Sequence, residues 1–203
     1  MKGLYIVTPD WDDTDKLLAT TEQALRGGAA LVQYRHKNAA PDLRREQARR
    51  LLELCRRHQR PFIVNDHVDL CLEIGADGIH VGGTDAGIAD VRAAVGPDRI
   101  VGASCYGSLQ LARDAHRAGA SYVAFGGFYP SRVKKYEVAT RPEMVAQAKA
   151  EIPLPNVVIG GMTEQNAAPL VAQGADMVAA ISSVYMADDP EAAARGFVRL
   201  FEK

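Results

Sequence analysis

The chain alternates short, almost continuous apolar runs with longer segments in which apolar positions recur every three or four residues. Uninterrupted apolar runs of this length are typical of parallel strands covered on both faces. They predict eight strands, at Leu4–Thr8, Ala30–Arg35, Phe62–Asp66, Gly78–Gly82, Ile100–Ser104, Tyr122–Gly126, Val157–Gly161 and Met177–Ser182. The longer segments predict helices, because their apolar positions share one face at the helical period.

Strict alternation of strands with helices favours a parallel sheet, and eight such units favour closure into a barrel. We therefore expect an α/β protein, a single-domain (β/α)8 TIM barrel over residues 1–203. A length of 203 residues lies near the lower bound for this fold and is too short for two ordinary domains. A doubly wound open sheet is the alternative that the same alternation allows.

Composition excludes several classes of partner. Hydrophobic residues make up 47% of the chain and charged residues 24%, which is typical of a globular protein. The net charge of −1 gives no general attraction to nucleic acid or to an anionic membrane, so any phosphate binding must come from a local site. No apolar run approaches the roughly 20 residues of a membrane span, and no signal-peptide pattern precedes the first strand, which predicts a cytoplasmic location. Cys55, Cys71 and Cys105 lack paired spacing, as expected for thiols in a reducing compartment.

In such a barrel, catalytic groups lie at the carboxyl ends of the strands and in the loops that follow. Gln33, Arg35 and Lys37 alternate along the end of the second predicted strand, so their side chains point the same way. A polar face with two cations suits an anion better than it suits a hydrophobic core. A solvated strand end with a salt bridge is the other interpretation.

Asn65 and Asp66 end the third predicted strand, and Asp85 follows the fourth. Neighbouring parallel strands lie about 4.8 Å apart, so the two carboxylates can converge on one cation. Two protein oxygens, completed by substrate phosphates and water, are a common way to hold Mg²⁺. Each acid can instead cap the following helix, which is frequent at such junctions.

The remaining strand ends offer hydrogen-bond donors for anions. Ser104 ends the fifth strand, and no nearby His/Asp pair or nucleophile-elbow motif makes it a nucleophile. Residues 128–136 after the sixth strand carry three cations, which predicts either a mobile lid over an anionic ligand or a solvated basic loop. The pairs Gly160–Gly161 and Ser182–Ser183 end the seventh and eighth strands, where barrels commonly bind phosphate through backbone amides.

The same residues carry a resemblance that covers essentially the whole chain. The sequence QYRHK resembles the Q-x-R-x-K motif of thiamine-phosphate synthases, and IVNDHVDLCLEIGADGIHVGGTD resembles their I-N-D…D-L…A-D-G-x-H-L-G-x-x-D segment. The stretches VGASCY, FGGFYPSRVKK, VVIGGM and VAAISSVY follow in the order of that family. Six motifs in register are far more specific than a single glycine pattern.

The resemblance implies a transferase that joins hydroxymethylpyrimidine pyrophosphate to 4-methyl-5-(2-phosphooxyethyl)thiazole, a thiazole phosphate, and releases pyrophosphate with the help of Mg²⁺. It assigns Arg35, Ser104 and Lys134 to catalysis, and Asp66 and Asp85 to the metal. The substrate-binding residues that it implies are Gln33, Arg35, Lys37, Asn65, Ser104, Ser131, Lys134, Gly161, Ile181 and Ser182. A homodimer is a further expectation, because small barrels often associate.

The chain departs from the family pattern at three positions. Gly83 stands where the family often has Gln, Gly127 where it often has Pro or Ser, and Val133 where a hydroxyl residue is frequent. Some relatives on this fold are thiazole tautomerases or apparent non-catalytic regulators that bind thiazole phosphate, and these lose the metal-binding acids. The tautomerases use a histidine near the sixth strand, whereas this chain has none between Ala124 and Tyr136, which favours the transferase.

Overall fold

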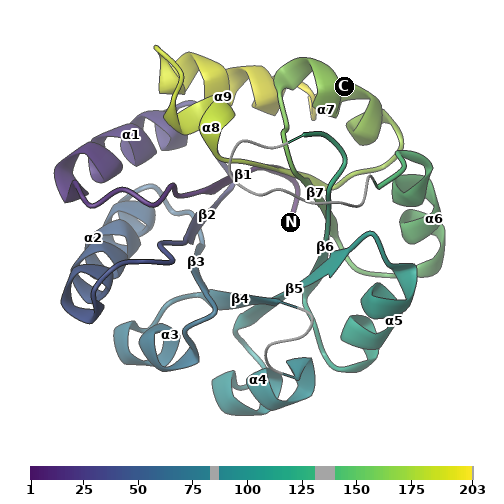
Figure 1. Ribbon diagram of the computed structural model, residues 1–203, viewed down its shortest axis with the longest axis horizontal. Helices are drawn as coiled ribbons and strands as arrows, with labels where there is room; N and C mark the ends of the chain where they lie inside the picture. Colours follow the sequence, from purple (N-terminus) through teal and green to yellow (C-terminus); the bar gives the residue numbers. More distant parts are fainter. Residues whose placement is uncertain (83–86, 131–139, 203) are drawn as a thin grey trace.

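A closed barrel of eight parallel strands forms the centre of the computed structural model, which describes residues 1–82, 87–130 and 140–202 (Figure 1). The strands are β1 (Gly3–Val7), β2 (Leu31–Tyr34), β3 (Phe62–Asn65), β4 (Gly78–Gly82), β5 (Ile100–Tyr106), β6 (Tyr122–Gly126), β7 (Asn156–Ile159) and β8 (Met177–Ala180). Each strand pairs with the next along the chain, and β8 pairs with β1. The predicted (β/α)8 barrel is therefore confirmed, and the pairing of β1 with β8 excludes the open sheet.

The helices form a ring outside the barrel (Figure 1). They are α1 (Thr14–Arg26), α2 (Pro41–Arg57), α3 (Val68–Ile74), α4 (Ile88–Val95), α5 (Leu109–Arg117), α6 (Glu143–Glu151), α7 (Glu164–Ala172), α8 (Ser182–Tyr185) and α9 (Pro190–Arg199). Several begin at a side chain that accepts a hydrogen bond from the first turn, as Asp13 does for α1 and Asp189 for α9. Within the described residues, none of these helices is both long enough and apolar enough to cross a membrane.

Six of the predicted carboxyl-terminal strand ends were wrong by one or two residues, those of β1, β2, β3, β5, β7 and β8. The backbone conformation explains three of them. β3 ends at Asn65, one residue early, because Asp66 takes a positive φ of 62°. β7 ends at Ile159 because Gly160 and Gly161 have φ values of 111° and 61°. β5 instead continues past Ser104, with an irregular register between Ser104 and Tyr106. Asp66 and the glycine pair therefore lie in the loops above the barrel.

Alternation along the strands separates two apolar regions. Inward-facing side chains such as Tyr5, Ile63 and Tyr122 fill the barrel, whereas outward-facing ones such as Leu4 and Phe62 pack against the helices. A cavity lies at one end of the barrel, above the inward-facing side chains. That end carries the carboxyl termini of all eight strands.

Candidate active site at the carboxyl end of the barrel

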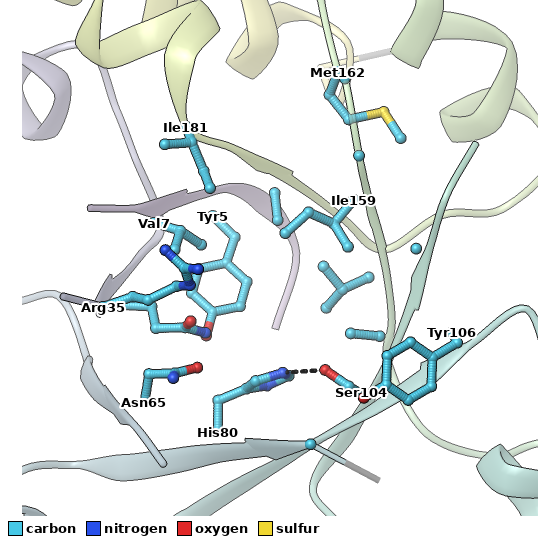
Figure 2. Close-up of a pocket in the computed structure, with 18 of the residues that line it drawn as sticks. Tyr5, Val7, Arg35, Asn65, His80, Ser104, Tyr106, Ile159, Met162 and Ile181 are labelled. Atoms are coloured by element: carbon cyan, nitrogen blue, oxygen red, sulfur yellow. Dashed lines mark hydrogen bonds between the residues drawn. The ribbon is translucent and has the colours of Figure 1, made fainter. Parts of the chain in front are cut away.

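A cavity open to solvent lies at the carboxyl ends of the strands (Figure 2). All the predicted site residues that the structure describes line it: Gln33, Arg35, Lys37, Asn65, Asp66, Ser104, Gly161, Ile181 and Ser182. Asp85, Ser131 and Lys134, which were also predicted, lie outside the described residues, as does most of the proposed lid. The structure thus brings together in one cavity residues that are up to 149 positions apart, from Gln33 to Ser182 (182 − 33).

The end of β2 supplies the cationic side of the cavity. Gln33, Arg35 and Lys37 line it, whereas Tyr34 is buried on the outer face and His36 pairs with Asp12 at 3.0 Å. This confirms the predicted alternation of side chains. Arg35 is only 7% exposed, and its side chain lies beside Tyr5 and Val7 in the cavity (Figure 2). A guanidinium shielded from water in this way interacts strongly with an anion.

Asp10, in the loop after β1, fixes the geometry of this cationic side. Its Oδ1 accepts a hydrogen bond from Arg35 Nη1 at 3.2 Å and from the backbone N–H of Lys37 at 3.1 Å. Thr8 also holds the end of β2 in place, because its Oγ accepts a hydrogen bond from the backbone N–H of Arg35 at 2.8 Å. Sequence reasoning missed Asp10, although it follows a strand end as the predicted site residues do.

Asn65 and Asp66 form a polar part of the cavity wall, next to the end of β2. Asn65 Nδ2 donates to Asp66 Oδ2 at 2.6 Å, and the backbone N–H of Asp66 donates to the carbonyl oxygen of His80 at 2.9 Å. The left-handed backbone at Asp66 turns the chain at this point, a conformation that Asp and Asn adopt more readily than most residues. Asp66 is exposed, so its carboxylate is accessible from the mouth. It does not cap α3, whose N-cap is His67 without a side-chain hydrogen bond.

The floor of the cavity is a continuous line of hydrogen bonds, which we call the floor network: Gln33, Tyr5, Tyr122, His80 and Ser104. Gln33 Nε2 donates to Tyr5 Oη at 2.6 Å, and the Tyr5 and Tyr122 hydroxyls share a bond of 2.7 Å. Tyr122 Oη lies 2.8 Å from His80 Nδ1, and His80 Nε2 lies 2.8 Å from Ser104 Oγ (Figure 2 shows the second contact). Five different strands therefore meet through side-chain polar groups.

Gly102 makes room for the floor network. A Cβ at this position would lie 2.1 Å from Tyr122 Cζ and 2.6 Å from His80 Nδ1, far inside van der Waals contact. Because residue 102 has no side chain, the Tyr122 and His80 rings stack with centroids 5.6 Å apart and planes 19° from parallel. Burial raises the pKa of Tyr5 and of Tyr122 above the ordinary value of 10.0, so both hydroxyls stay protonated near neutral pH.

The ends of β7 and β8 form the opposite side of the cavity. A Cβ on Gly161 would lie 2.3 Å from the carbonyl oxygen of Pro130, so glycine also lets the segment after β6 approach the end of β7. β8 passes through Ile181 directly into α8, which begins at Ser182. Amides in the first turn of a helix have no partner within that helix. Backbone donors are therefore the main polar groups on this side.

Gly127, one of the departures from the family pattern, has a φ of 82°. Proline, whose ring fixes φ near −65°, does not fit that conformation. The backbone at the start of the loop after β6 therefore turns in a direction that a proline at position 127 would not allow. Gly83 and Val133 lie outside the described residues.

An apolar wall lies between the two polar sides. Ile159 and Ile181 point into the cavity from the β7–β8 side, opposite Asn65 and His80 (Figure 2). Val7, Ala124, Val157, Met162 and Ala179 also line the cavity. Sequence reasoning assigned these residues to strands and not to the site, because apolar side chains at the top of a barrel look the same as core residues. The wall suits a flat, uncharged ring.

A closed (β/α)8 barrel with cations, a carboxylate and glycine-rich strand ends around one carboxyl-terminal cavity is typical of enzymes that act on small phosphate esters. Comparison with known proteins gives the family. The family model described as thiamine monophosphate synthase matches residues 4–184, and the chain belongs to this family.

Individual relatives agree with the family model. The chain is 66% identical over 203 residues to the thiamine-phosphate synthase of Janthinobacterium sp. (strain Marseille), covering 100% of this chain and 98% of that protein. It is 49% identical over 202 residues to that of Methylobacillus flagellatus, covering 99% and 96%. The solved structure of thiamine phosphate pyrophosphorylase from Pyrococcus furiosus superposes with a TM-score of 0.87 at 31% identity, covering 98% of this chain and 95% of that one. The resemblance found in the sequence is confirmed, and the chain is a transferase of thiamine biosynthesis.

Proposed function

We propose that the chain joins hydroxymethylpyrimidine pyrophosphate to the ring nitrogen of 4-methyl-5-(2-phosphooxyethyl)thiazole, forming thiamine phosphate and releasing pyrophosphate. The observation that carries the proposal is the division of one cavity between a cationic side and a side of glycine and helix-terminal backbone. Arg35, Lys37 and Asn65 lie on one side, and Gly161 and Ser182 lie on the other. Each substrate carries one phosphate-bearing group, so the cavity offers one side to each, with the apolar wall between for the rings.

The pyrophosphate of the first substrate is bound on the cationic side. Arg35 and Lys37 supply charge-assisted hydrogen bonds, which are stronger and shorter than neutral ones. Asn65 on the neighbouring strand adds an amide donor, and Ser104 reaches the same space from β5. Gln33, deeper in the cavity, contacts the pyrimidine ring. Lys134, assigned by the resemblance, contributes a further cation to the departing group.

Asp66 and Asp85 hold Mg²⁺ in this proposal. Asp66 is an exposed carboxylate on the cavity wall beside the proposed diphosphate site, and Mg²⁺ prefers oxygen ligands while it keeps phosphate and water oxygens in its shell. The donor chemistry at this wall therefore fits the ion. When bound, Mg²⁺ offsets the negative charge that builds on the leaving diphosphate. The part of Asp85 rests on the resemblance and on its place after the neighbouring strand.

The thiazole phosphate is bound on the opposite side. Gly161, Ile181 and Ser182 line the cavity, and their backbone amides are donors of the kind that barrels use for phosphate. The resemblance assigns Ser131, which lies outside the described residues, to the same phosphate. The compact cradle holds the acceptor so that its ring nitrogen faces the carbon that loses pyrophosphate.

The chemistry suits a site without a protein nucleophile. The electron-rich aminopyrimidine stabilises positive charge on its exocyclic carbon, so the bond from this carbon to the pyrophosphate oxygen breaks first and the leaving group takes the electron pair. The thiazole nitrogen then donates its lone pair to the same carbon. The protein supplies donors aimed at the leaving oxygen and holds the acceptor in line. Val7 and Ile159 belong to the apolar wall, which keeps water from the cationic carbon.

A pyrophosphate-release assay tests this function. We expect the purified chain to form pyrophosphate and thiamine phosphate only when both substrates and Mg²⁺ are present, and to stop when EDTA removes the metal. Isomerisation of the thiazole phosphate without pyrophosphate release would instead support a tautomerase. Binding of thiazole phosphate without turnover would support a regulator.

We further propose that the chain works in a reducing compartment, the cytoplasm. Cys55, Cys71 and Cys105 are all free and buried in the barrel's outer core. Proteins built with free core thiols are typical of reducing compartments. Cell fractionation with an antibody against the chain is the direct test.

A further inference from the structure

We propose that the floor network is a one-way hydrogen-bond relay that fixes the polarity of both its ends: Gln33 presents an acceptor to the cavity, and Ser104 presents a donor. Tyr5, Tyr122 and His80 are then positioning residues, because they act through Gln33 and Ser104. The proposal rests on the proposed function only for the identity of the ligand groups at the two ends. The direction of the relay is a property of the protein itself.

The direction begins at Gln33. An amide nitrogen donates and does not accept, so the 2.6 Å contact makes Tyr5 Oη an acceptor. The single hydrogen of the Tyr5 hydroxyl is then free to point at Tyr122 Oη, 2.7 Å away. Tyr122 accepts this hydrogen and turns its own hydrogen toward His80 Nδ1, at 2.8 Å. In this arrangement every hydroxyl hydrogen of the buried line has an acceptor, which is why we infer this direction and not its reverse.

His80 continues the same order of donors and acceptors from Tyr122 to Ser104. A neutral imidazole accepts at one ring nitrogen and donates from the other. Because Nδ1 accepts from Tyr122, the ring proton sits on Nε2 and is donated to Ser104 Oγ at 2.8 Å. Ser104 Oγ is thereby an acceptor from below, and its own hydrogen points into the cavity that the residue lines.

The surroundings keep the relay in one arrangement. Tyr5, Tyr122 and Gln33 are 1%, 0% and 5% exposed, so water does not compete for their hydrogen bonds. Hydrogen bonds in such a low-dielectric interior polarise one another along the line. The raised pKa values of Tyr5 and Tyr122 keep one hydrogen on each hydroxyl. Gly102 supplies the space in which the Tyr122 and His80 rings stack.

Both ends of the relay match the proposed substrate. The amide nitrogen of Gln33 is engaged with Tyr5, so its carbonyl oxygen is the group left to accept from an amino group on the pyrimidine ring. Ser104 donates to the oxygen on which negative charge develops as pyrophosphate leaves. A relay of the opposite direction would place a donor at Gln33 and an acceptor at Ser104, and both would repel those groups.

The position of the ring proton on His80 is the direct test. We expect ¹⁵N spectra of the ligand-free, histidine-labelled protein to show His80 with its proton on Nε2. The five histidines of the chain are separated by comparison with the variant His80→Gln, which lacks the His80 signals. A proton on Nδ1, or on both nitrogens at neutral pH, would overturn the proposal. The measurement needs no turnover, so it decides the relay even if the proposed reaction is not found.

Tyr122→Phe tests whether the tautomer of His80 is set by its neighbours in the floor network. Without the hydroxyl, His80 Nδ1 loses its donor, and we expect the ¹⁵N shifts to move toward a mixture of the two tautomers. Turnover should fall by about tenfold, the effect of one hydrogen bond, with little change in the KM of the thiazole phosphate. Unchanged His80 shifts in a folded Tyr122→Phe protein would overturn the proposal.

Tyr185→Phe is the matched control. Tyr185 is also a buried tyrosine, and its hydroxyl lies 2.9 Å from Thr21 Oγ on the outside of the barrel. Loss of this hydroxyl should lower the free energy of unfolding, as the loss of any buried hydrogen bond does. We expect the Tyr185→Phe protein to keep the tautomer of His80 and the turnover of the original chain. If Tyr185→Phe changes the His80 tautomer as much as Tyr122→Phe does, the effect is general loosening and the relay is wrong.

Discussion

Asp10 holds the Arg35 side chain and the backbone of Lys37 in place. One carboxylate oxygen accepts from the Arg35 guanidinium and from the backbone N–H of Lys37, so the orientation of the cationic side depends on it. We expect Asp10→Ala to weaken pyrophosphate binding by about tenfold, since two hydrogen bonds that orient the site are lost. Asp10→Asn keeps an oxygen acceptor and should bind within a few-fold of the original chain. The inhibition constant of pyrophosphate measures both effects.

Asp12 provides the control for Asp10. It pairs with His36 on the outer face of the same segment, and its side chain is 84% exposed. Asp12→Ala should therefore leave pyrophosphate inhibition unchanged. If Asp12→Ala weakens inhibition as much as Asp10→Ala does, the effect comes from the general negative charge of the loop and not from the orientation of Arg35.

Asp66 combines a conformational role with the proposed metal-binding role. Its φ of 62° is tolerated by Asp and Asn and costs about 1–2 kcal/mol for alanine. We expect Asp66→Asn and Asp66→Ala both to lose Mg²⁺-dependent turnover, while only Asp66→Ala lowers the free energy of unfolding by about that amount. Urea unfolding and the pyrophosphate assay separate the two roles. Full turnover in Asp66→Asn would contradict the metal assignment.

The polar lining of the cavity was predictable from the sequence to a large extent. The rule that barrel sites lie at strand ends selected Gln33, Arg35 and Ser104, and all three line the cavity. Asp10 was missed because the sequence alone does not distinguish it from Asp12, Asp13 and Asp15, which follow in the same acidic segment. The apolar lining residues were missed because a side chain that contacts a ligand and one that packs in a core have the same chemistry.

At the scale of elements, the sequence predicted which segments form strands better than where they end. All eight strands exist because each is a nearly continuous apolar run between two layers. Their ends depend on single backbone conformations, such as the positive φ at Asp66 and Gly160, which hydrophobic periodicity does not encode. The predicted strand Val157–Gly161 thus included two residues that belong to the phosphate-side loop.

Gly161 lets the segment that ends at Pro130 pack against the end of β7, so its replacement should lower the stability of the barrel. A Cβ would meet the carbonyl oxygen of Pro130 at 2.3 Å, and the φ of 61° already disfavours other residues. We expect Gly161→Ala to lower the free energy of unfolding by about 2–4 kcal/mol, the sum of a strained backbone and an overpacked contact. Urea unfolding monitored by circular dichroism measures the change.

Gly75 separates the two contributions at Gly161. Its φ is 67°, close to that of Gly161, but the nearest atom to a Cβ there lies 4.0 Å away. Gly75→Ala should therefore cost only the backbone strain, about 1 kcal/mol. Equal losses in the two variants would mean that the segment ending at Pro130 moves aside, and that its contact with β7 is weaker than the geometry indicates.

At the scale of the whole molecule, the floor network is the feature that the sequence could not reveal. Tyr5 and Tyr122 are 117 residues apart, and His80 and Tyr122 are 42 apart. Only the closure of the barrel and its register bring these inward positions to the same level. No local pattern indicates which of many tyrosines will face each other across a barrel, so the network had to come from the structure.

The free energy of unfolding should depend on alkaline pH through the three buried thiols. Burial raises the pKa of Cys55 to about 12, of Cys71 to about 11 and of Cys105 to about 12, from an ordinary value of 9.0. Between pH 9 and 11 the unfolded chain therefore loses protons that the folded chain retains. The contribution of the thiols to the free energy of unfolding should be constant below pH 9 and fall above it, by up to about 1.4 kcal/mol per pH unit for each thiol.

Urea unfolding between pH 8 and 10 tests this dependence, and replacement of the thiols identifies its source. In the variant with Cys55, Cys71 and Cys105 all changed to alanine, the decline between pH 9 and 10 should largely disappear, although the variant is less stable at every pH because of the cavities left behind. The buried tyrosines, whose ordinary pKa is 10.0, then account for the decline that starts at higher pH. A decline of unchanged slope in the alanine variant would show that the thiols already exchange protons with solvent in the folded barrel, and that the core around them opens without global unfolding.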